Sequence, residues 1–296
     1  MYIKQLLVSR PKNLLLYLPI PLGFLGLMVL NYLVIKLLKL DVNQIIKSEI
    51  AEKGVNQVFV ENMLPFVIGI AMLFAWVRFL HKQSLVTLTT SRSKIDWSRI
   101  FFSFSVWSLF TIVSTLLMYF SSPQNFQITF EPVPFLILLV LATLLIPIQT
   151  SFEEYLFRGY MMQGIGLATR KKIIPLLVTA FMFGMMHIAN PEVEKMGNII
   201  LIYYIGTGLF LGIVTLMDEG MELALGFHAA NNLVGALLIT SDWSAFQTDS
   251  ILKDTSIPSA GIDVLLPVFV VFPLLLFIFS KKYRWTNWKE KLAGTI

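Results

Sequence analysis

The chain has 296 residues, of which 56% are apolar and 14% are charged, and its mean hydropathy is +0.74. A soluble domain carries about a quarter charged residues, so this composition excludes an ordinary soluble protein and predicts a polytopic membrane protein. The formal net charge of +5 does not indicate nucleic-acid binding, because the basic residues flank apolar stretches and form no stripe on a soluble domain. The lack of cysteine excludes disulfides, thiolate metal sites and a cysteine nucleophile.

Apolar stretches long enough to span a bilayer, about 20 residues each, recur along the chain. The first follows basic residues and has no small-residue cleavage site, so we interpret it as a spanning helix and not as a signal peptide. The fifth and seventh are short and interrupted by polar residues, which is typical of helices buried among other helices. We predict an all-α bundle of about eight transmembrane helices, at residues 14–38, 57–80, 100–120, 133–162, 173–190, 198–217, 222–240 and 262–280.

The basic residues favour one orientation of this layout. With the N-terminus inside, the inner segments hold most of the 23 Lys and Arg residues, among them Lys4, Arg10 and Lys12. By the positive-inside rule, both termini of this integral membrane protein are expected in the cytoplasm. A compact chain without cysteine or targeting extensions fits a prokaryotic plasma membrane.

The expected organisation has three regions. Residues 1–130 hold about three N-terminal spans, residues 131–240 form a helical core, and residues 241–296 hold a polar loop, the last span and a basic tail.

Several smaller features carry structural expectations. The polar loops 41–56 and 241–261 are each either a short surface helix or a flexible cover. Trp285 and Trp288 stand beside a basic run and resemble an interfacial anchor. His81 lies in a basic loop and is expected to be solvated. Three glycines of the sixth span allow close helix packing, namely Gly206, Gly208 and Gly212.

Three charged residues fall in or just after the fourth apolar stretch, within S-F-E-E-Y-L-F-R-G-Y at residues 151–160. Charges in a membrane helix are costly and are usually retained for a function. Glu154 and Arg158 are four residues apart, so they share a helix face and can form an ion pair. Glu153 is rotated by roughly 100° and has no such partner, which leaves a free carboxylate suited to a general base. The alternative is a surface cluster just beyond the membrane edge.

Two of the three histidines lie in or at the edge of predicted spans. Phe183 precedes His187 by one helical turn, where its ring can exclude water and help to fix the imidazole. His228 and Asn232 are four residues apart and point the same way, so both can donate hydrogen bonds to a developing oxyanion. For each histidine the simpler alternative is a structural hydrogen bond between helices. If these spans converge, they supply the parts needed to add water to an amide carbonyl.

At this point the sequence resembles a known family. The patterns E-E-x-x-x-R, F-x-x-x-H and H-x-x-x-N, which span about 80 residues, are similar to the three motifs of the CPBP family. This family, also called ABI, comprises CAAX proteases and bacteriocin-processing enzymes and is related to the type II CAAX prenyl endopeptidases. The resemblance implies a bundle of about eight spans around a central catalytic cavity that opens to the cytoplasm.

The resemblance also implies an activity, that of an intramembrane endopeptidase acting on a membrane-associated or lipidated peptide. It implies a role for each motif residue: Glu153 and His187 activate water, His228 and Asn232 stabilise the oxyanion, and Glu154, Arg158 and Phe183 support the site.

The need for a metal stays open at this level. Glu153, His187 and His228 match a catalytic zinc set with one open position, and the family has often been described as metalloproteases. The pattern H-E-x-x-H is absent, however, and the same residues can act without a metal, so no cofactor is favoured.

Two other classes of function compete with the hydrolase. One is a non-proteolytic binding, immunity or scaffold protein of the same fold. The other is a transporter or ion pathway, which is disfavoured because the charges gather near one side. The expected partners are membrane lipids and a membrane-associated or lipidated peptide, with no nucleic acid, and the sequence predicts no oligomeric state.

Overall fold

The computed structural model describes residues 2–7 and 14–296, so Arg10 and Lys12 lie outside the described residues. The long apolar stretches are helical because, within a bilayer, each segment must satisfy its own backbone polar groups. Six helical stretches of the described chain are long and apolar enough to cross a membrane: Leu14–Leu38, Val55–Leu80, Trp97–Ser121, Pro132–Thr169, Ile200–Asp218 and Val264–Tyr283. They overlap six of the predicted spans, and the predicted all-α membrane bundle is confirmed.

The other two predicted spans form shorter helices, α8 (Ile173–Met185) and α11 (Glu222–Leu238). The α8 helix ends before the predicted limit at residue 190, because turns at residues 186–189 lead into the Pro191 that begins α9 (Pro191–Met196). Helix length in the described chain therefore does not confirm the predicted count of eight spans.

The remaining elements complete the chain between and after these helices. The helices are α1 (Pro19–Leu38), α2 (Val42–Lys53), α3 (Val55–Ala75), α4 (Leu85–Thr89), α5 (Trp97–Ser121), α6 (Pro132–Glu154), α7 (Met162–Thr169), α10 (Ile200–Asp218), α12 (Ile262–Leu266), α13 (Phe272–Tyr283) and α14 (Trp288–Ala293). Short 3₁₀ helices cover Ile3–Leu7, Leu14–Tyr17 and Pro123–Asn125, and π-helical segments cover Trp76–Leu80, Tyr155–Met161 and Pro267–Val271.

The two polar loops have different secondary structure: one forms a helix and the other contains a strand. Loop 41–56 contains α2, whose first turn is capped by Asp41 accepting a hydrogen bond from the backbone N–H of Gln44 at 3.0 Å. Loop 241–261 contains β3 (Leu252–Asp254), which lies between β1 (Phe126–Ile128) and β2 (Ile239–Ser241) in a small sheet. The β3 strand is antiparallel to β1 and parallel to β2.

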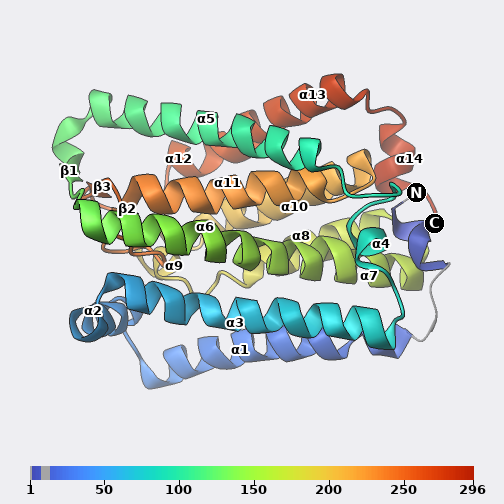
Figure 1. Ribbon diagram of the computed structural model, residues 1–296, viewed down its shortest axis with the longest axis horizontal. Helices are drawn as coiled ribbons and strands as arrows, with labels where there is room; N and C mark the ends of the chain where they lie inside the picture. The colour runs from blue at the N-terminus through green and yellow to red at the C-terminus, as the bar shows by residue number, and fades with distance from the viewer. Residues whose placement is uncertain (1, 8–13) are drawn as a thin grey trace.

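The long helices lie side by side along one direction (Figure 1). In this arrangement α6 packs against both α3 and α11, α11 also packs against α5, and α10 packs against α8. One end of the bundle carries α2, α9 and the small sheet, and the other carries α4, α14 and both chain ends (Figure 1). The two termini thus share one end of the bundle.

Close approach between helices depends on glycines. A Cβ atom on Gly226 of α11 would overlap the carbonyl oxygen of Ile100 in α5. A Cβ atom on Gly208 of α10 would lie 2.7 Å from the carbonyl oxygen of Ala180 in α8. The predicted packing role of the glycines of the sixth span is therefore confirmed, and α11 uses the same device.

Replacing Gly226 by alanine is expected to lower the free energy of unfolding by about 1–3 kcal/mol, because the α5 backbone must move to admit the methyl group. Gly235→Ala in the same helix is the matched control, since nothing lies within 4 Å of its Cβ position. Thermal unfolding of the purified variants in detergent measures the difference. Equal stability of the two variants would contradict the close approach of α5 and α11.

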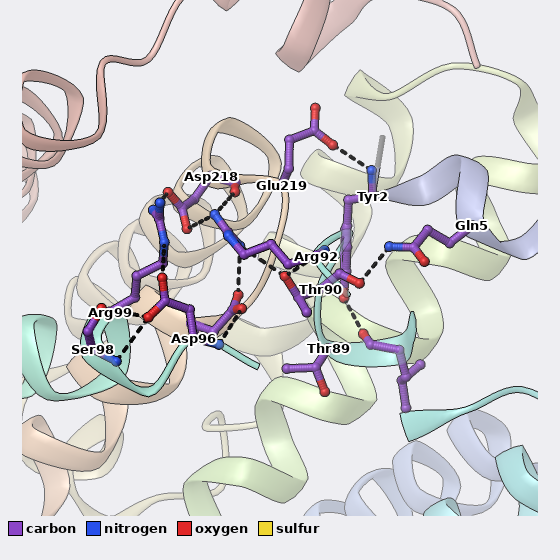
Figure 2. Close-up of polar contacts among 12 residues, drawn as sticks. Tyr2, Gln5, Thr89, Thr90, Arg92, Asp96, Ser98, Arg99, Asp218 and Glu219 are labelled. Carbon is purple, nitrogen blue, oxygen red and sulfur yellow. Dashed lines mark hydrogen bonds and ion pairs between the residues drawn. The ribbon is translucent and has the colours of Figure 1, made fainter. Parts of the chain in front are cut away.

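An ionic network ties the start of α11 to the loop before α5 (Figure 2). Arg92 pairs with Asp218 at 3.0 Å and with Glu222 at 3.2 Å, and Arg99 also pairs with Asp218. Both acidic side chains are buried, so they depend on these cationic partners. Because Glu222 begins α11, the network holds one end of the helix that carries the third motif.

The described N-terminal residues cover the same end of the bundle. The backbone N–H of Tyr2 donates to Glu219 at 2.5 Å (Figure 2). The buried Tyr2 hydroxyl lies 2.6 Å from the carbonyl oxygen of Leu88 and 3.2 Å from that of Arg158. This segment therefore contacts the backbone of the helix that carries the first motif.

Two side chains lie deeper than the sequence predicts. His81 is buried and not solvated, because Tyr17 packs over its ring at 4.3 Å between centroids and the Tyr160 hydroxyl lies 2.9 Å from its Nε2. Trp285 is buried and donates from Nε1 to Asp218 at 3.1 Å. The prediction of a solvated His81 is therefore wrong. Trp285 packs inside the protein, whereas Trp288 is exposed.

Candidate functional site

The first motif lies where the longest apolar helix changes its winding. Helix α6 ends at Glu154, the next residues wind as the π-helix Tyr155–Met161, and α7 continues the same stretch to Thr169. All seven residues of the π-helix are buried. Such π-helical turns are rare and occur frequently at functional sites.

Glu154 and Arg158 form the ion pair that their spacing predicts. The Arg158 Nη1 lies 2.8 Å from Glu154 Oε1, and both side chains are 0% exposed. The guanidinium also donates from Nη2 to the carbonyl oxygen of Gly208 at 3.1 Å and lies 4.3 Å from the centre of the Phe183 ring. The first motif is thus enclosed by α8 and α10, and the alternative of a surface cluster is wrong.

Glu153 is also buried, at 2% exposure, but it is less free than the sequence predicts. Its Oε1 accepts a hydrogen bond of 2.5 Å from the side chain of Gln149, one turn earlier in α6. Its Oε2 has no hydrogen-bond partner among the described residues and lies 3.6 Å from His228 Nε2. One carboxylate oxygen is therefore fixed, and the other faces an imidazole.

His228 is placed between the two glutamates of the first motif. Its Nδ1 lies 2.8 Å from Glu154 Oε1, and its Nε2 is directed towards Glu153. An ionised carboxylate can only accept hydrogen bonds, so Nδ1 of His228 carries a proton and donates a hydrogen bond to Glu154. His228 therefore makes a structural hydrogen bond between helices, as the simpler alternative predicts, and its Nε2 still faces Glu153.

His187 approaches the same region from the end of α8. Its Nδ1 lies 2.8 Å from the carbonyl oxygen of Phe183, an acceptor, so the neutral ring carries its proton on Nδ1 and leaves Nε2 as an acceptor. The ring of Tyr204 stacks on the imidazole with 4.2 Å between centroids and 10° between planes. Within the described residues, no hydrogen bond or ion pair joins His187 to Glu153 or His228.

The Phe183 ring lies between the two histidines. Its centroid is 5.2 Å from that of His187 and 5.7 Å from that of His228. The contact with His187 agrees with the F-x-x-x-H spacing, and the structure adds the contact of the same ring with His228.

Asn232 is linked to Glu153 through the side-chain amide of Gln149, a residue outside the three motifs. Its Nδ2 donates to Gln149 Oε1 at 3.0 Å, and its Oδ1 accepts from Asn231 Nδ2 at 3.0 Å. Gln149 could have been noticed, because it precedes Glu153 by four residues in a membrane helix. Tyr204 gives no comparable signal, since only the packing of α10 on α8 brings it to His187.

A cavity of about 470 Å³ lies near the motifs but is not lined by them. Lys36 of α1 and Lys39, directly after that helix, line one side, and residues 188–190, directly after His187, line the other. The cavity is also lined by Val42 of α2 and Val193 of α9, and these two helices lie at the end of the bundle opposite the termini (Figure 1). If this cavity is the entrance to the site, the site opens on the side of the membrane opposite the termini. In that case the two predictions, cytoplasmic termini and a site that opens to the cytoplasm, exclude each other.

The side chains considered for zinc are Glu153, His187 and His228. The Nδ1 atoms of both histidines have oxygen partners, which is how metal-binding histidines are commonly oriented. In the part of the chain that the structure describes, however, no three His, Asp or Glu side chains gather in a group that could hold a metal ion. No metal-bound step is therefore assigned to these residues.

Comparisons with known proteins agree with the motifs. The model of the family "Type II CAAX prenyl endopeptidase Rce1-like" matches residues 132–234, which include all three motifs. The chain is also 33% identical over 232 residues to the uncharacterized protein YyaK of Bacillus subtilis (strain 168), an overlap of 76% of this chain and 78% of the relative. No solved structure matches the chain. From its motifs and these two matches, the chain belongs to the type II CAAX prenyl endopeptidase Rce1-like family.

Proposed function

We propose that the protein is an intramembrane endopeptidase that hydrolyses a peptide bond in a membrane-associated or lipidated peptide or protein. The observation that carries the proposal is the carboxylate of Glu153. One of its oxygens is buried without a hydrogen-bond partner and lies 3.6 Å from His228 Nε2. An unsatisfied buried oxygen is costly, and an acceptor beside an imidazole is the arrangement that a general base for water requires. Membership of the family supports the same assignment.

In the proposed reaction, Glu153 removes a proton from water while the water oxygen bonds to the scissile carbonyl carbon. The acceptor Nε2 of His187 helps to orient that water. The carbonyl oxygen becomes an oxyanion and receives hydrogen bonds from His228 and Asn232. The C–N bond then breaks as the leaving nitrogen takes the proton held by Glu153, which restores the carboxylate.

Three further residues support this arrangement in the proposal. Because Nδ1 of His228 donates its hydrogen bond to Glu154, donation from Nε2 as well requires the imidazolium form, in which both ring nitrogens carry a proton. Arg158 balances the charge of Glu154 at 2.8 Å, and Phe183 packs against both imidazoles. The proposed setting is a prokaryotic plasma membrane. The distribution of Lys and Arg favours an orientation with both termini in the cytoplasm.

The test uses the purified protein in lipid nanodiscs and a fluorescence-quenched farnesylated peptide that ends in a CAAX sequence. We expect hydrolysis that continues in the presence of 1,10-phenanthroline, because the proposed water activation uses only side chains. Elemental analysis of the active preparation is expected to find no stoichiometric zinc. Loss of activity in the chelator, with recovery on adding zinc, would contradict the metal-free mechanism but not the peptidase function.

A second candidate function is a non-proteolytic binding, immunity or scaffold protein. The observation that favours it is the tight enclosure of the first motif, none of whose residues lines the cavity of about 470 Å³. Complementation of a deletion strain separates the two functions. Loss of the cellular phenotype in both Glu153→Ala and His228→Ala supports chemistry, whereas full complementation by both variants supports binding alone.

A further inference from the structure

Three helices are joined by an unbroken row of side-chain hydrogen bonds that ends on Glu153. The indole Nε1 of Trp107 in α5 donates to Asn231 Oδ1 in α11 at 3.0 Å. Asn231 Nδ2 donates to Asn232 Oδ1 at 3.0 Å, and Asn232 Nδ2 donates to Gln149 Oε1 in α6 at 3.0 Å. Gln149 Nε2 then donates to Glu153 Oε1 at 2.5 Å.

The two ends of this row fix its direction. An indole N–H can only donate, and an ionised carboxylate can only accept. Between Trp107 and Glu153, each of the three amides must therefore accept on the side of Trp107 and donate on the side of Glu153. Turning over any one amide would set two donors or two acceptors against each other. The hydroxyl of Tyr203 also lies 3.5 Å from the same Asn231 oxygen and can donate to it.

We propose that Trp107, Asn231 and Gln149 form a positioning relay for the catalytic residues. This inference rests on the proposed peptidase function and adds residues to the same site. Gln149 holds one oxygen of Glu153, so the other oxygen stays directed towards His228 Nε2 at 3.6 Å.

The relay also determines what Asn232 can offer to a substrate. Its oxygen is engaged by Asn231, and one of its two N–H bonds is engaged by Gln149. Its second N–H is therefore the group left to bind a developing oxyanion. Without Asn231 the amide is free to turn its oxygen towards the substrate, where it would repel the oxyanion.

The first arm of the test measures kcat and KM on the farnesylated peptide. Gln149→Leu is expected to lower kcat about tenfold or more, since it removes a hydrogen bond to a buried charged group. Trp107→Phe keeps an aromatic ring against Phe227 and removes the N–H donor at the far end of the row together with one ring of the indole, so we expect a several-fold loss in kcat with KM unchanged. In the Gln149→Leu background, Trp107→Phe should have a smaller effect than it has alone, because its route to Glu153 through Gln149 is already lost and only its route to Asn232 remains.

The matched control is Gln163→Leu, which removes another buried amide from the same continuous helix. Gln163 hydrogen-bonds Gln83 and the carbonyl oxygens of Thr87 and Leu88, and among the described residues no hydrogen bond joins it to the relay. It is expected to lower thermal stability while leaving kcat unchanged. Independent, multiplicative effects of Trp107→Phe and Gln149→Leu on kcat would overturn the positioning role.

A second arm separates failure of the relay from failure of the proposed function. Thermal unfolding of the same single and double variants in detergent needs no activity, so it applies even if the peptide is not cleaved. The relay predicts non-additive shifts in melting temperature for the Trp107 and Gln149 substitutions, since both belong to one hydrogen-bond network. Additive shifts would refute the relay, whereas coupled shifts without hydrolysis would refute only the peptidase.

Discussion

Replacing Glu153 by glutamine is expected to lower kcat for peptide hydrolysis by about three orders of magnitude, the middle of the range for a lost general base. The amide that replaces the carboxylate has the same shape but cannot take a proton from water at neutral pH. One oxygen of Glu153 has no hydrogen-bond partner among the described residues, so the substitution removes few contacts and is expected to preserve the fold. Initial rates on the farnesylated peptide and a thermal unfolding curve together separate lost chemistry from lost fold.

Glu192→Gln is the matched control for this prediction. Glu192 also has a buried oxygen without a hydrogen-bond partner, and it belongs to α9 and not to the three motifs. Its substitution is expected to leave kcat nearly unchanged, because the hydrogen bond that Glu192 accepts comes from the backbone N–H of Ala245 and not from a motif residue. A fully active Glu153→Gln protein, or an equal loss in both variants, would contradict the assignment of Glu153 as the base.

Replacing Arg158 by methionine is expected to destabilise the protein by about 3–5 kcal/mol, the usual consequence of leaving one partner of a buried ion pair without the other. Arg158 is 0% exposed, and Glu154 would keep only its contact with His228. The change also removes the hydrogen bond to the Gly208 carbonyl oxygen and the contact with the Phe183 ring. Unfolding in mixed micelles with increasing denaturing detergent measures the loss.

The double variant Glu154→Leu and Arg158→Met tests the cause of that loss. Removing both members of a buried pair is often close to neutral, because no uncompensated charge remains. We therefore expect the double variant to recover much of the stability while remaining inactive. If Arg158→Met alone were as stable as the unmodified protein, the pair would not be holding α6 to α8 and α10.

Much of the first motif is readable from the sequence because its contacts are local. The spacing of Glu154 and Arg158 places them on one helix face, and the structure pairs them at 2.8 Å. The same spacing of four residues relates Gln149 to Glu153 and predicts a hydrogen bond between them. An uncharged glutamine is a weaker signal in a membrane helix than a charged residue, so this pair is harder to identify from the sequence. The π-helical winding after Glu154 has no sequence signal that we recognise.

Contacts between helices are less predictable, because they depend on which segments become neighbours. Asn232 finds Gln149 only through the packing of α11 on α6. His81 appears solvated in a basic loop, yet Tyr17 and Tyr160 enclose it once the N-terminal segment folds over the bundle end. The spans themselves are predictable from length and hydropathy, whereas α8 is shorter because turns and Pro191 end it early.

The most direct test of the account is hydrolysis in water enriched in oxygen-18, followed by mass spectrometry of both peptide fragments. If Glu153 directs water to the scissile carbonyl, the new carboxyl terminus gains one heavy oxygen in a single turnover, and the Glu153→Gln protein forms no labelled fragment. Cleavage without label, or labelled cleavage at an equal rate by Glu153→Gln, would contradict glutamate-activated hydrolysis as the function of this site.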